Sequence, residues 1–269
     1  MREYVVNTLG RALWSGVLLI GLPVAVAWLL QRMGDRIRTI GCRSGRAYWY
    51  FVAIGVACHE TGHAVGTWMT GNRVTEFVPF TLDREDGPSP NAIGWVRHTV
   101  GSGVWGKVSQ LIISTGPIWF GGLLIVLLSR FLVGQEINIS YNDFFGSGEL
   151  PELSAYLMAC LRCASSLCCD LVGGALFSGW KIIIWAYLVF CIASEIGMSS
   201  KDLKNASAGF VVVLGIMLAL LFLPFVGKWI QVVVALLLPK FFIVHVLMIL
   251  AVFINTGFLV LESFIVRIL

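Results

Sequence analysis

The sequence predicts an all-α polytopic membrane protein with five to seven transmembrane helices and one small β-hairpin. The chain has 269 residues, of which 58% are hydrophobic and 13% are charged. A soluble domain is about half apolar and about one quarter charged, so this balance is typical of an integral membrane protein. The apolar residues also gather in long blocks, several of which are long enough to cross a bilayer.

These apolar blocks set the expected order of elements along the chain. We treat residues 1–269 as a single integral membrane domain: an N-terminal helix and basic loop (1–46), a core that carries the motif described below (47–209), and C-terminal helices (210–269). Arginines dominate the predicted loop after the first block. A proline and a lysine interrupt the last apolar region. The predicted spans are 13–30, 49–69, 108–133, 153–178, 180–198, 210–226 and 241–261.

The net charge of +4 is small for a chain of this length. It comes largely from arginines near the predicted helix ends, where positive charge orients a membrane protein. We therefore expect a lipid bilayer as a partner and no binding of nucleic acid.

A short polar stretch after the second block has the pattern of a β-hairpin. Residues 74–78 and 93–97 are rich in β-branched and aromatic side chains. The segment 83–91 between them contains Asp, Gly, Pro, Ser and Asn, which favour turns. The sequence therefore predicts two strands joined by a long loop.

The second apolar block contains the motif His59-Glu60-Thr61-Gly62-His63. Positions i and i+4 share one face of a helix, so His59 and His63 can bind the same metal ion. Zinc suits two imidazoles and a carboxylate, with water in the open position. Glu60 follows His59 directly and is expected to contact that water as a general base, then to pass its proton to a leaving amine.

The residues around the motif favour a metal site over a solvated helix face. Segments 48–58 and 64–69 are nearly all apolar, and polar side chains there are costly unless they are satisfied. Gly55, Gly62 and Gly66 are expected to let other helices approach closely.

A third metal ligand is expected from the later half of the chain. Asp202 lies at a predicted helix junction, and Ser199-x-x-Asp202 also has the pattern of a capping box. The two roles are compatible, because a capped helix end can also present a carboxylate to a metal. Glu195 is the runner-up ligand, since it lies in an apolar segment and would need a partner there.

Three further polar residues are candidates for roles in or near the site. His98 follows the second predicted strand and is a candidate to hydrogen-bond a developing oxyanion or to bind zinc, although it also fits an exposed loop histidine. His245 and Asn255 lie in the last apolar region, where we expect them to form interhelical hydrogen bonds; a ligand role for His245 and a substrate-gating role for Asn255 are the less favoured alternatives.

Together these features resemble the site-2 protease class of intramembrane zinc metalloproteases, the M50-like families. The matching parts are the motif on a membrane helix, the β-prone segment after it, Gly116-Pro117 in the next apolar block, and an aspartate at a later helix junction. Residues 94–98 with Ser199-x-x-Asp202 look like a small bacterial branch of membrane metalloproteases. The Asn-Pro-x-x-x-x-Asp-Gly and Leu-Asp-Gly motifs that usually carry the third ligand are absent, which affects the assignment of Asp202 more than the class.

The resemblance implies a zinc-dependent endopeptidase that cleaves membrane-embedded or membrane-anchored proteins. It implies a multi-pass protein of a bacterial inner (plasma) membrane, with membrane partner subunits as a possibility. An exposed strand edge of the hairpin could hold an unwound substrate segment. Two alternatives stay open. One is a metallopeptidase of the other HExxH type, with a glutamate such as Glu195 as third ligand. The other is a non-proteolytic scaffold or transporter subunit with a structural or inactive metal site.

Overall fold

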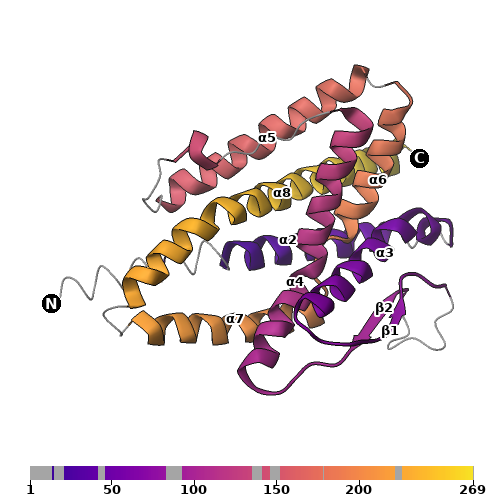
Figure 1. The fold of residues 1–269 in the computed structure, drawn as a ribbon. Coiled ribbons are helices and arrows are strands. Elements are labelled where there is room, and N and C mark those ends of the chain that lie inside the picture. The colour runs from indigo at the N-terminus through magenta and orange to yellow at the C-terminus, as the bar shows by residue number, and fades with distance from the viewer. Residues whose placement is uncertain are drawn as a thin grey trace.

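The computed structural model is mostly helical, with one small two-stranded sheet (Figure 1). It describes residues 14, 21–41, 46–82, 93–134, 141–145, 152–177, 179–221 and 226–268. The elements of these residues are α2 (Leu22–Gly41), α3 (Arg46–Met69), β1 (Val74–Val78), β2 (Trp95–His98), α4 (Gly103–Leu128), the π-helix η3 (Ser129–Val133), the 3₁₀-helix η4 (Tyr141–Asp143), α5 (Leu153–Phe177), α6 (Lys181–Glu195), α7 (Ser200–Leu221) and α8 (Val226–Ile268).

The helix with the histidine motif, α3, packs against two neighbours, α4 and α6. In turn, α4 packs against α7, while α8 packs against α2 and α5. The largest group of buried apolar side chains lies between α5, α6 and α8, and includes Tyr156, Trp185 and Phe242. This packing fixes α3 between α4 and α6, whose backbone carbonyls accept hydrogen bonds from the two histidines.

Three glycines allow the close packing of α3. A Cβ atom at Gly62 would lie 2.7 Å from the Cα atom of Pro117 on α4, and one at Gly66 would lie 3.0 Å from the Cα atom of Ile113. A Cβ atom at Gly55 would collide with the backbone carbonyl of Cys191 on α6. The prediction that these glycines admit neighbouring helices is confirmed, since any side chain would push the backbones apart.

The predicted hairpin is also confirmed. Strands β1 and β2 pair antiparallel, with Val78 opposite Trp95 and an irregularity in β1 just after Val74. Glu76 joins the strands through its side chain, because its carboxylate accepts a 2.8 Å hydrogen bond from Trp95 and lies 2.9 Å from the Arg97 guanidinium. The expected loop at 83–91 lies outside the described residues.

The first described helix differs from the sequence prediction. The arginines after residue 30 were expected in a loop, but α2 continues as far as Gly41. Arginine is a good helix former, and Leu30, Met33 and Ile37 continue one buried face along this helix. The N-terminal part of the predicted span at 13–30 lies outside the described residues, apart from residue 14.

Two breaks also differ from expectation. Helix α8 is continuous through Pro239, where an interruption was predicted; prolines are tolerated where surrounding helices satisfy the freed backbone groups. The polar break expected at 199–205 is shorter, because α7 already begins at Ser200. Helices α6 and α7 meet there with a bend of 64°. This early start places Asp202 in the first turn of α7.

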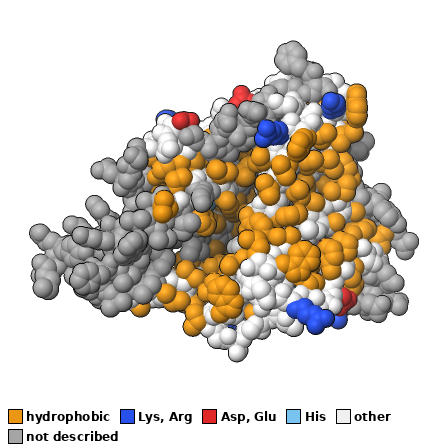
Figure 2. Space-filling view, in the orientation of Figure 1, with side chains coloured by type: hydrophobic (Ala, Val, Ile, Leu, Met, Phe, Trp, Pro, Cys, Tyr) orange, Lys and Arg blue, Asp and Glu red, His pale blue; other side chains and the backbone are white. Residues whose placement is uncertain are grey.

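The described residues contain one helical segment that is long and apolar enough to cross a bilayer, Gly103–Val133. The bent pair Lys181–Glu195 and Ser200–Ile216 would be a second if it crosses as one unit, and the apolar helix Phe241–Gly257 is shorter. One or two such helices are weak evidence for a membrane protein, so the five to seven spans stay a prediction. Figure 2 shows hydrophobic side chains over much of one face of the molecule.

Candidate metal centre

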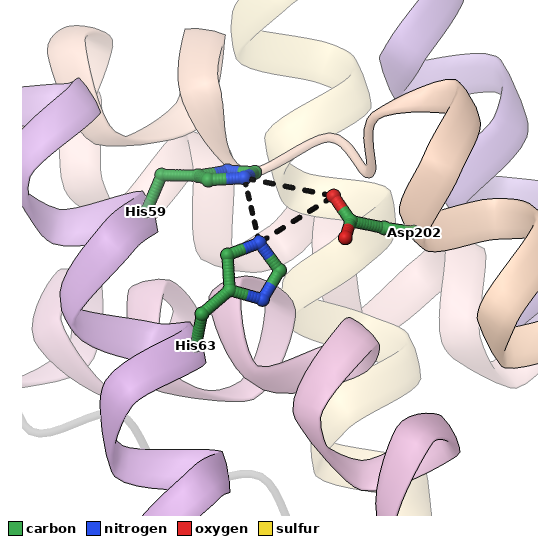
Figure 3. A group of neighbouring side chains, drawn as sticks. All are labelled: His59, His63 and Asp202. Atoms are coloured by element: carbon green, nitrogen blue, oxygen red, sulfur yellow. Dashed lines mark hydrogen bonds and ion pairs between the residues drawn. The ribbon is translucent and has the colours of Figure 1, made fainter. Parts of the chain in front are cut away.

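The structure brings His59, His63 and Asp202 together at one point (Figure 3). The two histidines lie one turn apart on α3, and Asp202 reaches them from the first turn of α7. The two Nε2 atoms are 3.1 Å apart, and the Asp202 Oδ2 atom lies 3.4 Å from that of His63 and 3.9 Å from that of His59. Such a group of two imidazoles and a carboxylate could hold a metal ion. We call these three residues the metal group.

Backbone carbonyls fix the orientation of both imidazole rings. His59 Nδ1 donates a 2.6 Å hydrogen bond to the carbonyl of Glu195, and His63 Nδ1 donates a 2.8 Å hydrogen bond to the carbonyl of Ile113. A carbonyl can only accept, so each Nδ1 atom carries the hydrogen and a neutral ring has its lone pair on Nε2. Hydrogen bonds of this kind typically orient metal-binding histidines.

The geometry of the three side chains fits a divalent cation. Two neutral imidazoles would oppose their lone pairs across 3.1 Å, beside a carboxylate. A cation bound by both Nε2 atoms and by the carboxylate would remove the repulsion between these lone pairs. With bonds of about 2.0–2.1 Å and tetrahedral angles, neighbouring ligand atoms are about 3.3–3.4 Å apart. The observed separations lie close to this value, and closing the longest of them requires a movement of about half an ångström.

Asp202 is held in place by Ser199, the residue directly before α7. Ser199 donates to the Asp202 Oδ2 atom from its hydroxyl at 2.5 Å and from its backbone amide at 3.1 Å. The Asp202 amide donates in return to the Ser199 hydroxyl. This reciprocal pair is a capping box, as the sequence predicted. The same carboxylate oxygen therefore caps α7 and faces the two histidines.

The three residues border a cavity of about 550 Å³. Its walls come from α2, α3, β2, α4 and the junction of α6 and α7, and they include Glu60 and His98. Gly94, just before β2, packs closely over Glu60, because a Cβ atom there would lie 3.0 Å from the Glu60 Cγ atom. The hairpin thus covers the motif on α3. The cavity has space for a small molecule or a peptide segment beside the metal group.

His98 lines this cavity but is not part of the metal group. Its Nδ1 atom is buried and has no hydrogen-bond partner among the described residues. Burial lowers the pKa of His98, and the positive charge of Lys201 lowers it further. A neutral imidazole at this position can donate a hydrogen bond into the cavity from one ring nitrogen.

The other candidates have different environments. The carboxylate of Glu195 does not belong to the metal group, although its side chain is buried and lines the cavity. Glu195 acts on the site through its backbone carbonyl, which no side-chain pattern in the sequence could reveal. His245 lies 2.7 Å from the Tyr156 hydroxyl, and Asn255 donates to the carbonyl of Ala193 at 2.8 Å. The prediction of interhelical hydrogen bonds is therefore confirmed for both residues.

Comparisons of the chain with protein-family models, curated proteins and solved structures found no match.

Proposed function

We propose that this chain is a zinc-dependent endopeptidase that cleaves membrane-embedded or membrane-anchored proteins. The observation that carries the proposal is the convergence of His59, His63 and Asp202 beside a cavity that also contains Glu60. Three protein ligands with one open side are typical of catalytic zinc, whereas structural zinc usually has four. The resemblance to site-2 proteases, drawn from the sequence, points in the same direction.

Glu60 is the proposed general base. It takes one proton from the attacking water, whose oxygen bonds to the carbonyl carbon of the scissile peptide. When the carbon–nitrogen bond breaks, Glu60 returns the proton to the leaving amine. A zinc ion, when bound, would lower the pKa of that water and polarise the carbonyl. His98 is the proposed donor to the oxygen on which negative charge develops, since it lines the same cavity and its pKa is lowered.

Strand β2 is the proposed holder of the substrate backbone. The Thr99 amide, just after β2, donates to the carbonyl of Arg73 at 2.9 Å. Backbone groups alternate in direction along a strand, so those of Val96 and His98 point away from β1. All four residues of β2 line the cavity. An extended substrate segment could pair with this edge, which carries no further strand among the described residues, and its peptide bonds would then face the metal group.

Exposed apolar side chains support a membrane location. Trp68 is 64% exposed at the end of α3, and Trp105 is 59% exposed at the start of α4. Two more aromatic side chains are exposed near the opposite end of α4: Phe131 lies just after α4, and Trp180 lies just before α6. Aromatic side chains often gather at the two interfaces of a bilayer. On the face in Figure 2, hydrophobic side chains fill the middle and charged ones lie at the margins.

The test is cleavage of a model transmembrane substrate by Glu60→Gln in parallel with measurement of bound zinc. We expect this variant to keep its zinc and to lose cleavage, while Glu152→Gln, outside the cavity, keeps both. Full activity of Glu60→Gln would refute the mechanism.

Asp202→Ala should lose zinc and Glu195→Gln should not; the reverse result would favour the other HExxH class. A site with four protein ligands and no bound water would favour a scaffold or transporter subunit.

A further inference from the structure

A second, more open cavity of about 530 Å³ lies between α2 and α7. Each helix contributes residues at positions i, i+3, i+4 and i+7, so one face of each helix forms one wall. We call this cavity the α2–α7 groove. Its lining residues are Trp28, Gln31, Arg32 and Asp35 from α2, and Ser200, Leu203, Lys204 and Ser207 from α7.

The groove is rich in hydrogen-bond donors and carries a positive charge. Arg32 and Lys204 are exposed and face one acidic residue, Asp35. Across the ranges that the structure covers, neither basic side chain forms a salt bridge. The Arg32 guanidinium lies over the Trp28 ring at 5.3 Å, which holds it at the groove. The hydroxyls of Ser200 and Ser207 lie on the opposite wall.

We propose that the α2–α7 groove binds a phosphate group, and specifically the headgroup of an anionic phospholipid. A guanidinium can donate two parallel hydrogen bonds to phosphate oxygens, and a lysine adds a point charge. The Ser200 hydroxyl, which accepts from Gln31, keeps its own hydrogen as a further donor, whereas the Ser207 hydroxyl already donates to the carbonyl of Lys204 at 2.9 Å. Trp28 is 48% exposed and Leu203 lies across from it, so the groove also offers apolar surface to the glycerol and acyl part of a lipid. Free phosphate shares the charged contacts but gains nothing from this apolar surface.

The groove adjoins the metal centre. Gln31 and Asp35 line both the groove and the cavity of the metal group. Gln31 donates a 2.8 Å hydrogen bond to the hydroxyl of Ser200, which directly follows Ser199 in the capping box of Asp202. A headgroup that contacts Ser200 therefore stabilises the turn that presents Asp202. This link rests on the proposed metal centre, whereas binding in the groove does not.

The first experiment measures lipid binding to the full chain in neutral detergent, without any protease readout. Phosphatidylglycerol, phosphatidylcholine and inorganic phosphate are added separately, and bound lipid is counted by native mass spectrometry. We expect phosphatidylglycerol to bind about tenfold or more tightly than phosphatidylcholine, and the double variant Arg32→Gln/Lys204→Gln to lose this preference. The control Lys107→Gln/Arg162→Gln removes the same charge from exposed positions outside the groove and should keep the preference.

Each outcome decides the proposal. Equal loss in both double variants, or no preference for phosphatidylglycerol in the native chain, would overturn it. If inorganic phosphate competes fully with the lipid, the phosphate site stands but its lipid source is refuted. A zinc titration tests the link: phosphatidylglycerol should tighten zinc binding in the native chain and not in Arg32→Gln/Lys204→Gln. If phosphatidylglycerol binds but does not tighten zinc binding, the lipid site in the groove stands and its link to the metal centre is refuted. Glu60→Gln, which should lose cleavage, should still bind phosphatidylglycerol. This result would show that binding in the groove does not depend on the proposed peptidase activity.

Discussion

The contact between α3 and α4 at Gly62 should control both stability and metal binding. In Gly62→Ala, the new Cβ atom would lie 2.7 Å from the Cα and N atoms of Pro117. Both are backbone atoms, so no side-chain rotation can relieve the contact. Ordinary carbon contacts are about 3.5–4.0 Å, so the two helices must separate by roughly 1 Å.

The size of the effect follows from this displacement. Overpacking of a close contact typically costs about 1–3 kcal/mol of unfolding free energy. The hydrogen bond from His63 to the carbonyl of Ile113 also crosses this interface, at 2.8 Å. Separation by roughly 1 Å would break that bond, and loss of such a support typically weakens metal affinity about 10- to 100-fold.

The assay is reversible unfolding in mixed micelles together with a zinc titration. Gly215→Ala is the matched control, because Gly215 lies within α7 and a Cβ atom there would meet nothing within 4 Å. That control should be neutral or stabilising, since alanine favours helix by up to about 1 kcal/mol over glycine. If Gly62→Ala has the unfolding free energy and zinc affinity of Gly215→Ala, the close approach of α3 and α4 is refuted.

Three further predictions concern the support of the site. Ser199→Ala should weaken zinc binding about 10- to 100-fold, because Asp202 loses its hydroxyl donor, while Ser165→Ala on α5 should leave the zinc titration unchanged. Asn255→Leu should lower the unfolding midpoint by the equivalent of about 1–3 kcal/mol, because the buried carbonyl of Ala193 loses its donor; an unchanged midpoint would contradict this. Removal of metal with a chelator should lower the thermal unfolding midpoint, and zinc should restore it while magnesium should not.

The three residues of the candidate metal centre could be predicted from the sequence because their signals are local. The spacing of His59 and His63 indicates one helix face, and the relation of Ser199 to Asp202 indicates a capped helix start. Both patterns need only a few neighbouring residues. The hairpin was predictable for the same reason, since β-prone segments flank a run of turn formers.

The supports of the site could not be predicted, because they are backbone groups brought together by tertiary packing. Any residue can supply a carbonyl, so nothing in the sequence marks Glu195 or Ile113 as partners of the histidines. The extent of α2 was missed because arginines after an apolar block resemble a loop, although a buried face continues through them. The continuity of α8 depends on neighbours that sequence periodicity does not reveal.

The junction of α6 and α7 has a consequence for the order of assembly. His59 contacts a carbonyl 136 residues further along the chain, and Asp202 approaches the same pair of histidines from just beyond that carbonyl. A metal ion here would close a loop that contains about half of the protein, and closing so long a loop carries a large entropic cost. Metal uptake should therefore come late in folding, after α3 and the α6–α7 bend have met. Once bound, the ion would hold the two halves of the chain together.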